Sequence, residues 1–258
     1  MVKQWKGFLK SWFLFTELVR KGIRLKYRRS YLGILWSLME PILTTCVLVL
    51  VFGTLYSNKR PDFPVYIICG RLLYAFFSQT TKQTCKSIRK NATMIKKVYV
   101  PKYMYPLADV TFHFIIFAIS LLALIPVMIY SHVAPTHYIW QVFPAMLFIF
   151  LATLGIGMFL STINVFFRDI EYLWNVVSML IMYMCAIFYY PEKILDSNLS
   201  WILKLNPIYC SIDIFRGGMM GYLAPSWNYI YAAGFGVVAI VVGTLFFKMN
   251  QDKFILHI

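Results

Sequence analysis

The sequence predicts an all-α integral membrane protein with six transmembrane helices. Of its 258 residues, 60% are apolar and only 14% are charged, and the mean hydropathy is +0.67. That is far more apolar than a soluble domain of this length needs to be. The apolar residues also gather in runs of about 20, the length that crosses roughly 30 Å of hydrocarbon. Because no Pro/Gly/Ser-rich linker interrupts them, we expect residues 1–258 to form a single membrane domain.

The first element, over residues 1–30, is expected to be an amphipathic helix rather than a span. Trp5, Trp12, Val19 and Ile23 recur on one helical face, and lysines occupy the opposite face. Such a helix lies in the membrane interface, with its indole rings at headgroup depth and its lysines near anionic lipid. Two roles stay open for it, a plain membrane anchor and a contact with a cytoplasmic partner.

Six apolar runs follow that are long enough to span a bilayer. Their approximate limits are 34–56, 64–84, 107–130, 141–166, 172–190 and 228–247. In the last run, Ala232 with Gly236 and Ala239 with Gly243 place small residues four positions apart. This spacing permits close approach of a neighbouring helix, so we interpret these residues as structural.

The distribution of Lys and Arg predicts the orientation. Nine of them precede the first span and seven lie in residues 82–106, whereas residues 131–140 contain none. By the positive-inside rule the two basic segments are cytoplasmic, and six crossings then place both termini in the cytoplasm. The net charge of +15 is therefore attributed to contact with membrane lipids, and no nucleic-acid partner is expected.

Residues 191–227, before the last span, are expected to form a re-entrant helical hairpin on the outer side. Their apolar pieces are too short to cross, and they are interrupted at Asn206-Pro207 and at Gly217-Gly218. Non-helical backbone at membrane depth needs protein or a water-lined cavity to satisfy it. An amphipathic loop lying on the headgroups is the alternative.

No motif for chemistry is found. The sequence contains neither a GxxxxGK[ST] phosphate loop nor HExxH, GxSxG or paired-cysteine metal spacing. The five scattered cysteines are expected to be buried packing residues. We therefore predict no catalytic residue, no metal and no cofactor bound by this chain.

Several side chains in or beside the spans are candidates for a channel or gate. Glu40 is one, because an ionisable group at membrane depth is costly and often functional, although with Pro41 it also fits a helix kink. Aromatic residues make up 18% of the chain, and aromatic rings can stack on sugars. The candidates are Trp36, Glu40, Tyr183, Phe188, Tyr189 and Tyr190.

Four short motifs run along almost the whole chain in order. They are RRSYLGILWS at 28–37 followed by Glu40-Pro41, YVPK at 99–102, NVFFRDI at 164–170 and LNP at 205–207. Together they resemble the permeases of type-2 ABC transporters that export O-antigen, teichoic acid and capsule.

This resemblance implies a transporter permease rather than an enzyme, in the bacterial cytoplasmic (inner) membrane. It implies a homodimer with a channel between the copies and two copies of a separate ABC ATP-binding subunit, which would bind the ATP and Mg. The substrate would be a polysaccharide linked to undecaprenyl diphosphate, such as O-antigen of lipopolysaccharide or teichoic acid.

The resemblance also assigns roles to residues. Coupling to the ATP-binding subunit would involve Asn91, Met94, Ile95, Lys96, Lys97, Val98, Arg168 and Asp169. Arg28 and Arg29 would receive the lipid diphosphate, because the guanidinium fork suits phosphate.

Two alternatives remain. The first is a permease of the same ABC group that exports drugs or small lipids. The second is an integral-membrane enzyme acting on polyprenyl phosphates, which would need an acidic cluster at the interface. The sequence offers only isolated carboxylates such as Asp169 with Glu171.

Overall fold

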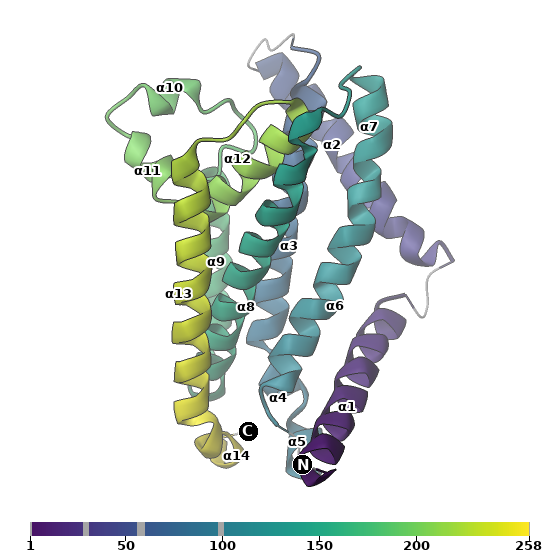
Figure 1. The fold of residues 1–258 in the computed structure, drawn as a ribbon, viewed down its shortest axis with the longest axis vertical. Helices are drawn as coiled ribbons and strands as arrows, with labels where there is room; N and C mark the ends of the chain where they lie inside the picture. Colours follow the sequence, from purple (N-terminus) through teal and green to yellow (C-terminus); the bar gives the residue numbers. More distant parts are fainter. Residues whose placement is uncertain (1, 28–30, 56–59, 98–100, 258) are drawn as a thin grey trace.

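The computed structural model describes residues 2–27, 31–55, 60–97 and 101–257, and these residues are predominantly helical (Figure 1). The α-helices are α1 (Val2–Tyr27), α2 (Trp36–Leu55), α3 (Phe63–Cys85), α4 (Ser87–Lys90), α5 (Ala92–Lys97), α6 (Met104–Ser120), α7 (Leu124–Tyr130), α8 (Val142–Phe166), α9 (Ile170–Tyr183), α10 (Glu192–Leu195), α11 (Ser200–Lys204), α12 (Pro207–Met220), α13 (Ser226–Asn250) and α14 (Phe254–His257). Short 3₁₀ turns cover Gly33–Leu35, Leu121–Ala123, His137–Gln141 and Gln251–Lys253.

The long helices form an upright bundle with two distinct ends. The two chain termini lie at one end with α4, α5 and α14, and we call this the terminal end (Figure 1). Helices α10, α11 and α12 lie at the opposite end, together with the tops of α2 and α7, and we call this the far end. The basic helix α1 begins at the terminal end, where the basic helices α4 and α5 also lie (Figure 1).

Among the residues that the structure describes, four helical segments are long and apolar enough to cross a membrane: Gly33–Thr54, Met104–Tyr130, His137–Phe166 and Ser226–Lys253. They coincide with predicted spans one, three, four and six, and their length and composition are those of an integral membrane protein. Helix α3 lies at predicted span two but carries Arg71 and Lys82. Helix α9 is apolar but ends at Tyr183, not at residue 190. The count of six spans stays a prediction.

Helix α3 is the centre of the bundle, packed against α2, α6, α8, α9 and α12. Most of its residues are buried, including the polar Thr80, Thr81 and Thr84. Because protein rather than lipid surrounds it, α3 needs no continuous apolar surface. This explains why its composition is more polar than that of the other long helices.

Helices α8 and α13 approach each other most closely through small residues. A Cβ atom added to Gly155 would collide with the backbone of Ala239, and one added to Gly243 would collide with the backbone of Gly155. Gly236 likewise faces Leu151 and Phe148. The structural interpretation of the small residues in the last run is confirmed.

At the far end, α12 is a single buried helix. The Asn206 side chain accepts hydrogen bonds from the backbone N–H groups of Ile208 and Tyr209, at 3.0 and 3.3 Å, and Pro207 occupies the first helical turn. The predicted interruption at Gly217-Gly218 is wrong: α12 continues to Met220 and ends at Gly221, whose φ is +85°. The two glycines instead let α12 pack tightly against Gln141 and Val142.

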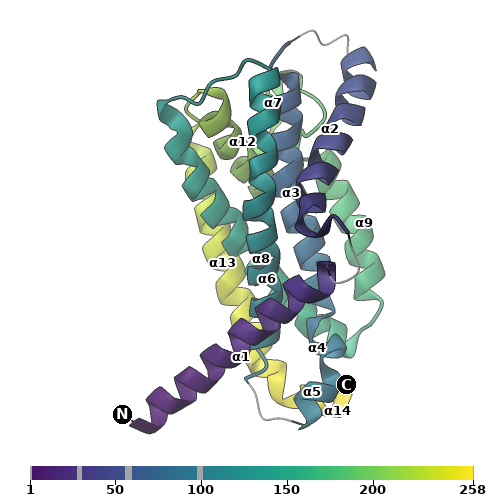
Figure 2. The ribbon, with the colours of Figure 1, turned by 90° about the vertical axis from the view of Figure 1, so that its right-hand side faces the viewer.

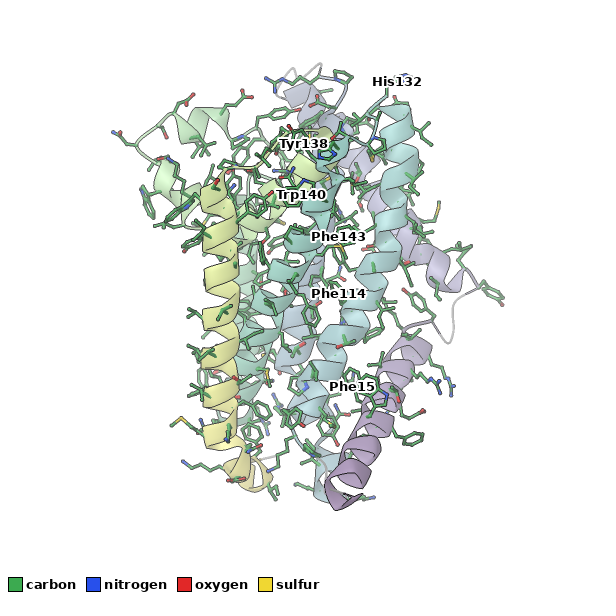
Figure 3. All side chains as sticks on the ribbon, viewed as in Figure 1. Phe15, Phe114, His132, Tyr138, Trp140 and Phe143 are labelled. Carbon is green, nitrogen blue, oxygen red and sulfur yellow. The ribbon has the colours of Figure 1, made fainter. Side chains whose placement is uncertain are left out.

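Helix α1 crosses the bundle obliquely (Figure 2). Its second half packs Val19 against Ala108, Phe112 and Ile116 of α6, with Phe15 at the edge of this cluster (Figure 3). Trp12 and Phe13 are exposed. The predicted apolar face of α1 therefore has two parts. Helix α6 covers one part, and the other is exposed.

Candidate functional site

A polar network at the terminal end joins two segments that are far apart in sequence, residues 86–89 and residues 164–171. The Glu171 carboxylate accepts hydrogen bonds from the side chains of Arg89 at 3.1 Å and Asn164 at 3.0 Å. It also forms an ion pair with Lys86 at 3.0 Å. Asn164 is fully buried and also donates to the backbone carbonyl of Cys85 at 2.8 Å. We call Lys86, Arg89, Asn164 and Glu171 the terminal clamp. It fixes α4 against the connection between α8 and α9.

The local sequence explains how Glu171 reaches this position. Helix α8 ends at Phe166, and Phe167 is extended, with φ −132°. The chain reverses there, and the carbonyl of Asp169 accepts the first hydrogen bonds of α9. Glu171 thus lies in the first turn of α9, where a negative charge interacts favourably with the helix dipole.

The pKa of the Glu171 carboxyl lies below its ordinary value of 4.5. Partial burial alone raises this pKa, but the hydrogen bonds from Lys86 and Asn164 and the charges of Lys86 and Arg89 outweigh that effect. Glu171 is therefore ionised at neutral pH, and the clamp is a charged network.

The predicted coupling residues on α5 separate into two groups. Ile95 is only 7% exposed and packs in a cluster with Ile88, Tyr105 and Phe254, so it anchors α5 instead of facing a partner. Met94 is 38% exposed. Lys96 and Lys97 are also exposed.

The remaining coupling candidates lie beside these groups or outside the described residues. Asn91 joins α4 to α5: its amide donates to the Ser87 carbonyl at 2.8 Å and its own carbonyl accepts from Met94 and Ile95. Phe167, Arg168 and Asp169 are exposed at the reversal between α8 and α9. Val98 lies outside the described residues.

We use the name docking surface for the exposed residues of these two segments: Met94, Lys96, Lys97, Phe167, Arg168 and Asp169. The terminal clamp connects its two halves.

The two arginines predicted to receive a lipid diphosphate, Arg28 and Arg29, lie outside the described residues. Just before them, Lys26 lines a small cavity of about 80 Å³ between α1, α2, α3 and α6. Glu40, Arg71 and His113 also line it. The cavity brings the gate candidate Glu40 close to cationic groups on α1 and α3, which the sequence did not indicate. Trp36 is exposed at the start of α2.

The aromatic gate candidates lie where α9 ends and the chain turns back. Tyr183 is exposed on the last turn of α9. The ring of Phe188 stacks on that of Phe52 of α2, with the ring centroids 5.0 Å apart. The Tyr189 hydroxyl donates a hydrogen bond to the Tyr183 carbonyl at 2.9 Å. The ring of Tyr190 packs against that of Tyr66, with the centroids 4.5 Å apart. Phe188 to Tyr190 therefore belong to a non-helical segment and not to a fifth span.

Arg216 of α12 holds this segment in place, a role that sequence reasoning missed. Its guanidinium donates to the carbonyl oxygens of Tyr66 at 3.2 Å and Ala186 at 3.1 Å. Tyr66 donates its hydroxyl to the carbonyls of Ala186 and Tyr189, at 2.8 and 2.9 Å. The available signal was a lone arginine within an apolar helix, which must find polar partners in the protein.

Within the described residues, no cluster of His, Cys, Asp and Glu is suited to hold a metal ion. The geometry shows a helical protein with segments long and apolar enough to span a membrane and with exposed charged and apolar side chains gathered at one end. Residues 14–220 match the family model described as ABC-2 type transporter. The chain therefore belongs to the ABC-2 transporter family, a family of permeases and not of enzymes.

Curated relatives agree with this family over nearly their whole length. An O-antigen export system permease protein RfbA from Klebsiella pneumoniae is 27% identical over 93% of each chain. A protein of the same name from Myxococcus xanthus is 27% identical over 93% of this chain and 94% of its own. The polysialic acid transport protein KpsM from Escherichia coli is 22% identical over 91% and 92%.

Proposed function

We propose that this protein is the permease subunit of an ATP-driven exporter that moves lipid-linked polysaccharide across the bacterial cytoplasmic membrane. Membership in the ABC-2 family and the polysaccharide-export names of its relatives support this function. The substrate is a glycan on undecaprenyl diphosphate, such as O-antigen or teichoic acid. The terminal end, with both termini, faces the cytoplasm, and residues 191–227 form the outer re-entrant hairpin of a six-span domain.

The single observation that carries the mechanism is the connection between the docking surface and the terminal clamp. An ATP-binding subunit, which supplies the ATP and Mg sites, contacts Lys96, Lys97, Arg168 and Asp169. Because Arg89 and Glu171 are paired at 3.1 Å, movement of α4 and α5 is transmitted to α9. Helix α9 carries Tyr183, a candidate for the channel wall.

A second copy of the chain completes the channel in this proposal. Helices α2 and α9 lie on the same side of the bundle (Figure 2). Both keep broad apolar faces exposed, and Ser178 is the buried residue of α9. We place the twofold contact there, with two permeases bound to two ATP-binding subunits. Trp36 and Glu40 on α2 and Tyr183 on α9 then border the path of the glycan.

The test is co-purification of the chain with the ABC ATP-binding subunits of the same bacterium, followed by ATPase and surface-glycan assays. We expect a stable complex that Lys96→Glu, Lys97→Glu and Arg168→Glu together dissociate. Lys248→Glu, an exposed basic residue of α13 outside the docking surface, is the matched control and should leave the complex intact. Purification of the wild-type chain without any ATPase would contradict the proposal.

The alternative, an exporter of drugs or small lipids, is distinguished by which compound accumulates inside cells that lack the gene. Deleting the gene should leave lipid-linked glycan inside the cell and remove it from the surface. An unchanged surface glycan together with increased drug sensitivity would favour the alternative.

A further inference from the structure

A cleft of about 1050 Å³ opens at the far end, between the α10–α11 segment and helices α12 and α13. Helices α10 and α11 stand out from the bundle beside the start of α13 (Figure 1), and residues of both helices line the cleft. Ligand pockets combine largely apolar walls with a few placed polar groups, and this cleft has the volume to hold several sugar rings. Of the gate candidates, only Tyr190 lies on its wall, and no role assigned above uses the remainder of the cleft.

Two tryptophans form the aromatic part of the cleft. Trp201 of α11 is 57% exposed and Trp227 in the first turn of α13 is 49% exposed. The Trp227 indole N–H donates to the Lys204 carbonyl at 3.1 Å, and its ring stacks on Tyr231 at 5.7 Å. The orientation of Trp227 is therefore fixed before any ligand arrives, which lowers the entropic cost of binding.

The polar part of the cleft centres on Asp213 of α12. One carboxylate oxygen accepts from the Tyr222 hydroxyl and the other from the Asn228 amide, each at 2.8 Å. A carboxylate oxygen can accept a second hydrogen bond. Asp213 is thus a rigid acceptor at the wall of the cleft, suited to a pair of neighbouring hydroxyl groups.

The charges of the lining do not favour a phosphate. Three acidic residues, Asp62, Glu192 and Asp213, face two basic ones, Arg60 and Lys204. Arg60 is already paired with Glu192 at 3.2 Å. A site for the diphosphate carrier would need an excess of cations. Flat aromatic faces beside a fixed carboxylate match a ligand with apolar ring faces and many hydroxyls.

We propose that this cleft binds a short run of uncharged sugar residues of the exported glycan. The inference rests on the proposed function and deepens it by placing a glycan site at the exit end of each subunit. Sugar rings stack on Trp201 and Trp227, and their hydroxyls donate to Asp213. A bound segment resists sliding back toward the channel between cycles.

An aromatic belt at the membrane surface is the competing explanation, because Trp and Tyr gather there in membrane proteins. Trp140 supplies the matched control. It is exposed at the same end and stacks on Tyr229 at 6.2 Å, but it does not line the cleft (Figure 3). A belt residue needs no fixed carboxylate beside it, whereas a sugar site does.

The experiment measures binding of lipid-free oligosaccharides, released from the host's own surface glycan, to the full permease–ATPase complex in nanodiscs. We expect Trp201→Ala and Trp227→Ala each to weaken binding roughly tenfold, a typical loss for one aromatic contact. Asp213→Asn should weaken it as well, and Trp140→Ala should not. Trp201 is exposed, so its variant keeps the test valid if Asp213→Asn misfolds.

Two results would overturn the proposed site. One is equal weakening by Trp140→Ala and Trp201→Ala, which indicates a membrane belt. The other is unchanged binding in both cleft tryptophan variants. Glycan export by the wild-type complex is measured in parallel: export without cleft binding removes only the site, whereas absence of export removes the proposed function itself.

Discussion

The guanidinium of Arg216 donates a hydrogen bond to the carbonyl oxygen of Ala186 at 3.1 Å. Ala186 lies just after the end of α9. Ala186 has a φ of +46°, a conformation that non-glycine residues rarely adopt. Arg216 is 1% exposed, and its guanidinium lies over the Tyr66 ring at 3.5 Å. Arg216 of α12 thus pairs a carbonyl of the irregular backbone between α9 and α10 and, through the Tyr66 carbonyl, links this backbone to α3.

Arg216→Met should destabilise the protein by about 3 kcal/mol, because two hydrogen bonds from a charged donor are lost inside the bundle. The measurement is thermal unfolding of the purified chain in detergent. Arg216→Lys keeps the charge but not the planar fork, and we expect an intermediate loss. Equal stability of Arg216→Met and wild type would show that Arg216 does not hold the segment.

Gly155→Ala should lower the unfolding temperature, because its Cβ has no space against the backbone of Ala239. Overpacking of this kind costs about 1 to 3 kcal/mol. Gly234→Ala is the control on α13: nothing lies within 4 Å of its added Cβ, and Ala is the better helix former. It should be neutral or slightly stabilising. The same unfolding temperature for both variants would contradict this account of α8 and α13.

Ile95→Ala should cost about 2 to 4 kcal/mol of stability, as expected for a buried side chain. Met94→Ala, at the exposed neighbouring position, should change stability by less than about 0.5 kcal/mol. It should, however, weaken binding of the ATP-binding subunit. Unfolding and co-purification are measured on both variants. A Met94→Ala variant with full partner affinity would remove Met94 from the docking surface.

Glu171→Gln should leave the complex assembled but reduce the export achieved per ATP hydrolysed. The neutral amide loses the ion pairs with Lys86 and Arg89, so α4 and α9 no longer move together. ATPase rate and glycan export are measured on the same preparation. Arg168→Gln, at the exposed docking surface, should instead reduce binding of the partner. A Glu171→Gln complex with wild-type export per ATP would show that the clamp does not transmit the movement.

The clamp also predicts a pH dependence. Because the pKa of Glu171 is lower in the folded protein than the ordinary 4.5, its contribution to stability is complete above about 4.5. It is lost as pH falls through the lowered value. The difference in unfolding temperature between wild type and Glu171→Gln should therefore be constant from neutral pH to about pH 5 and shrink in more acidic buffer. A difference that grows on acidification would contradict the assignment.

Some features of the protein followed from the sequence by itself. The apolar runs and the basic segments mark which parts of the chain can enter a membrane, because composition alone sets the cost of burial in lipid. The small residues of α13 predicted a close helix contact, and Gly155 of α8 supplies the other side of it. The motifs at 28–37 and 164–170 led to the family.

Only the tertiary structure decided which apolar surfaces face protein and which stay open. Ile95 and Met94 are neighbours in sequence, yet one is in the core and the other is exposed. In a membrane protein, periodicity cannot separate these cases, because lipid-facing and protein-facing residues are both apolar.

The polar connections likewise required the fold. Arg89 and Glu171, or Arg216 and Ala186, are far apart along the chain, and nothing in the local sequence pairs them. Helix propensity is a local property, whereas the satisfaction of a buried charge or an irregular backbone depends on what the rest of the bundle brings beside it.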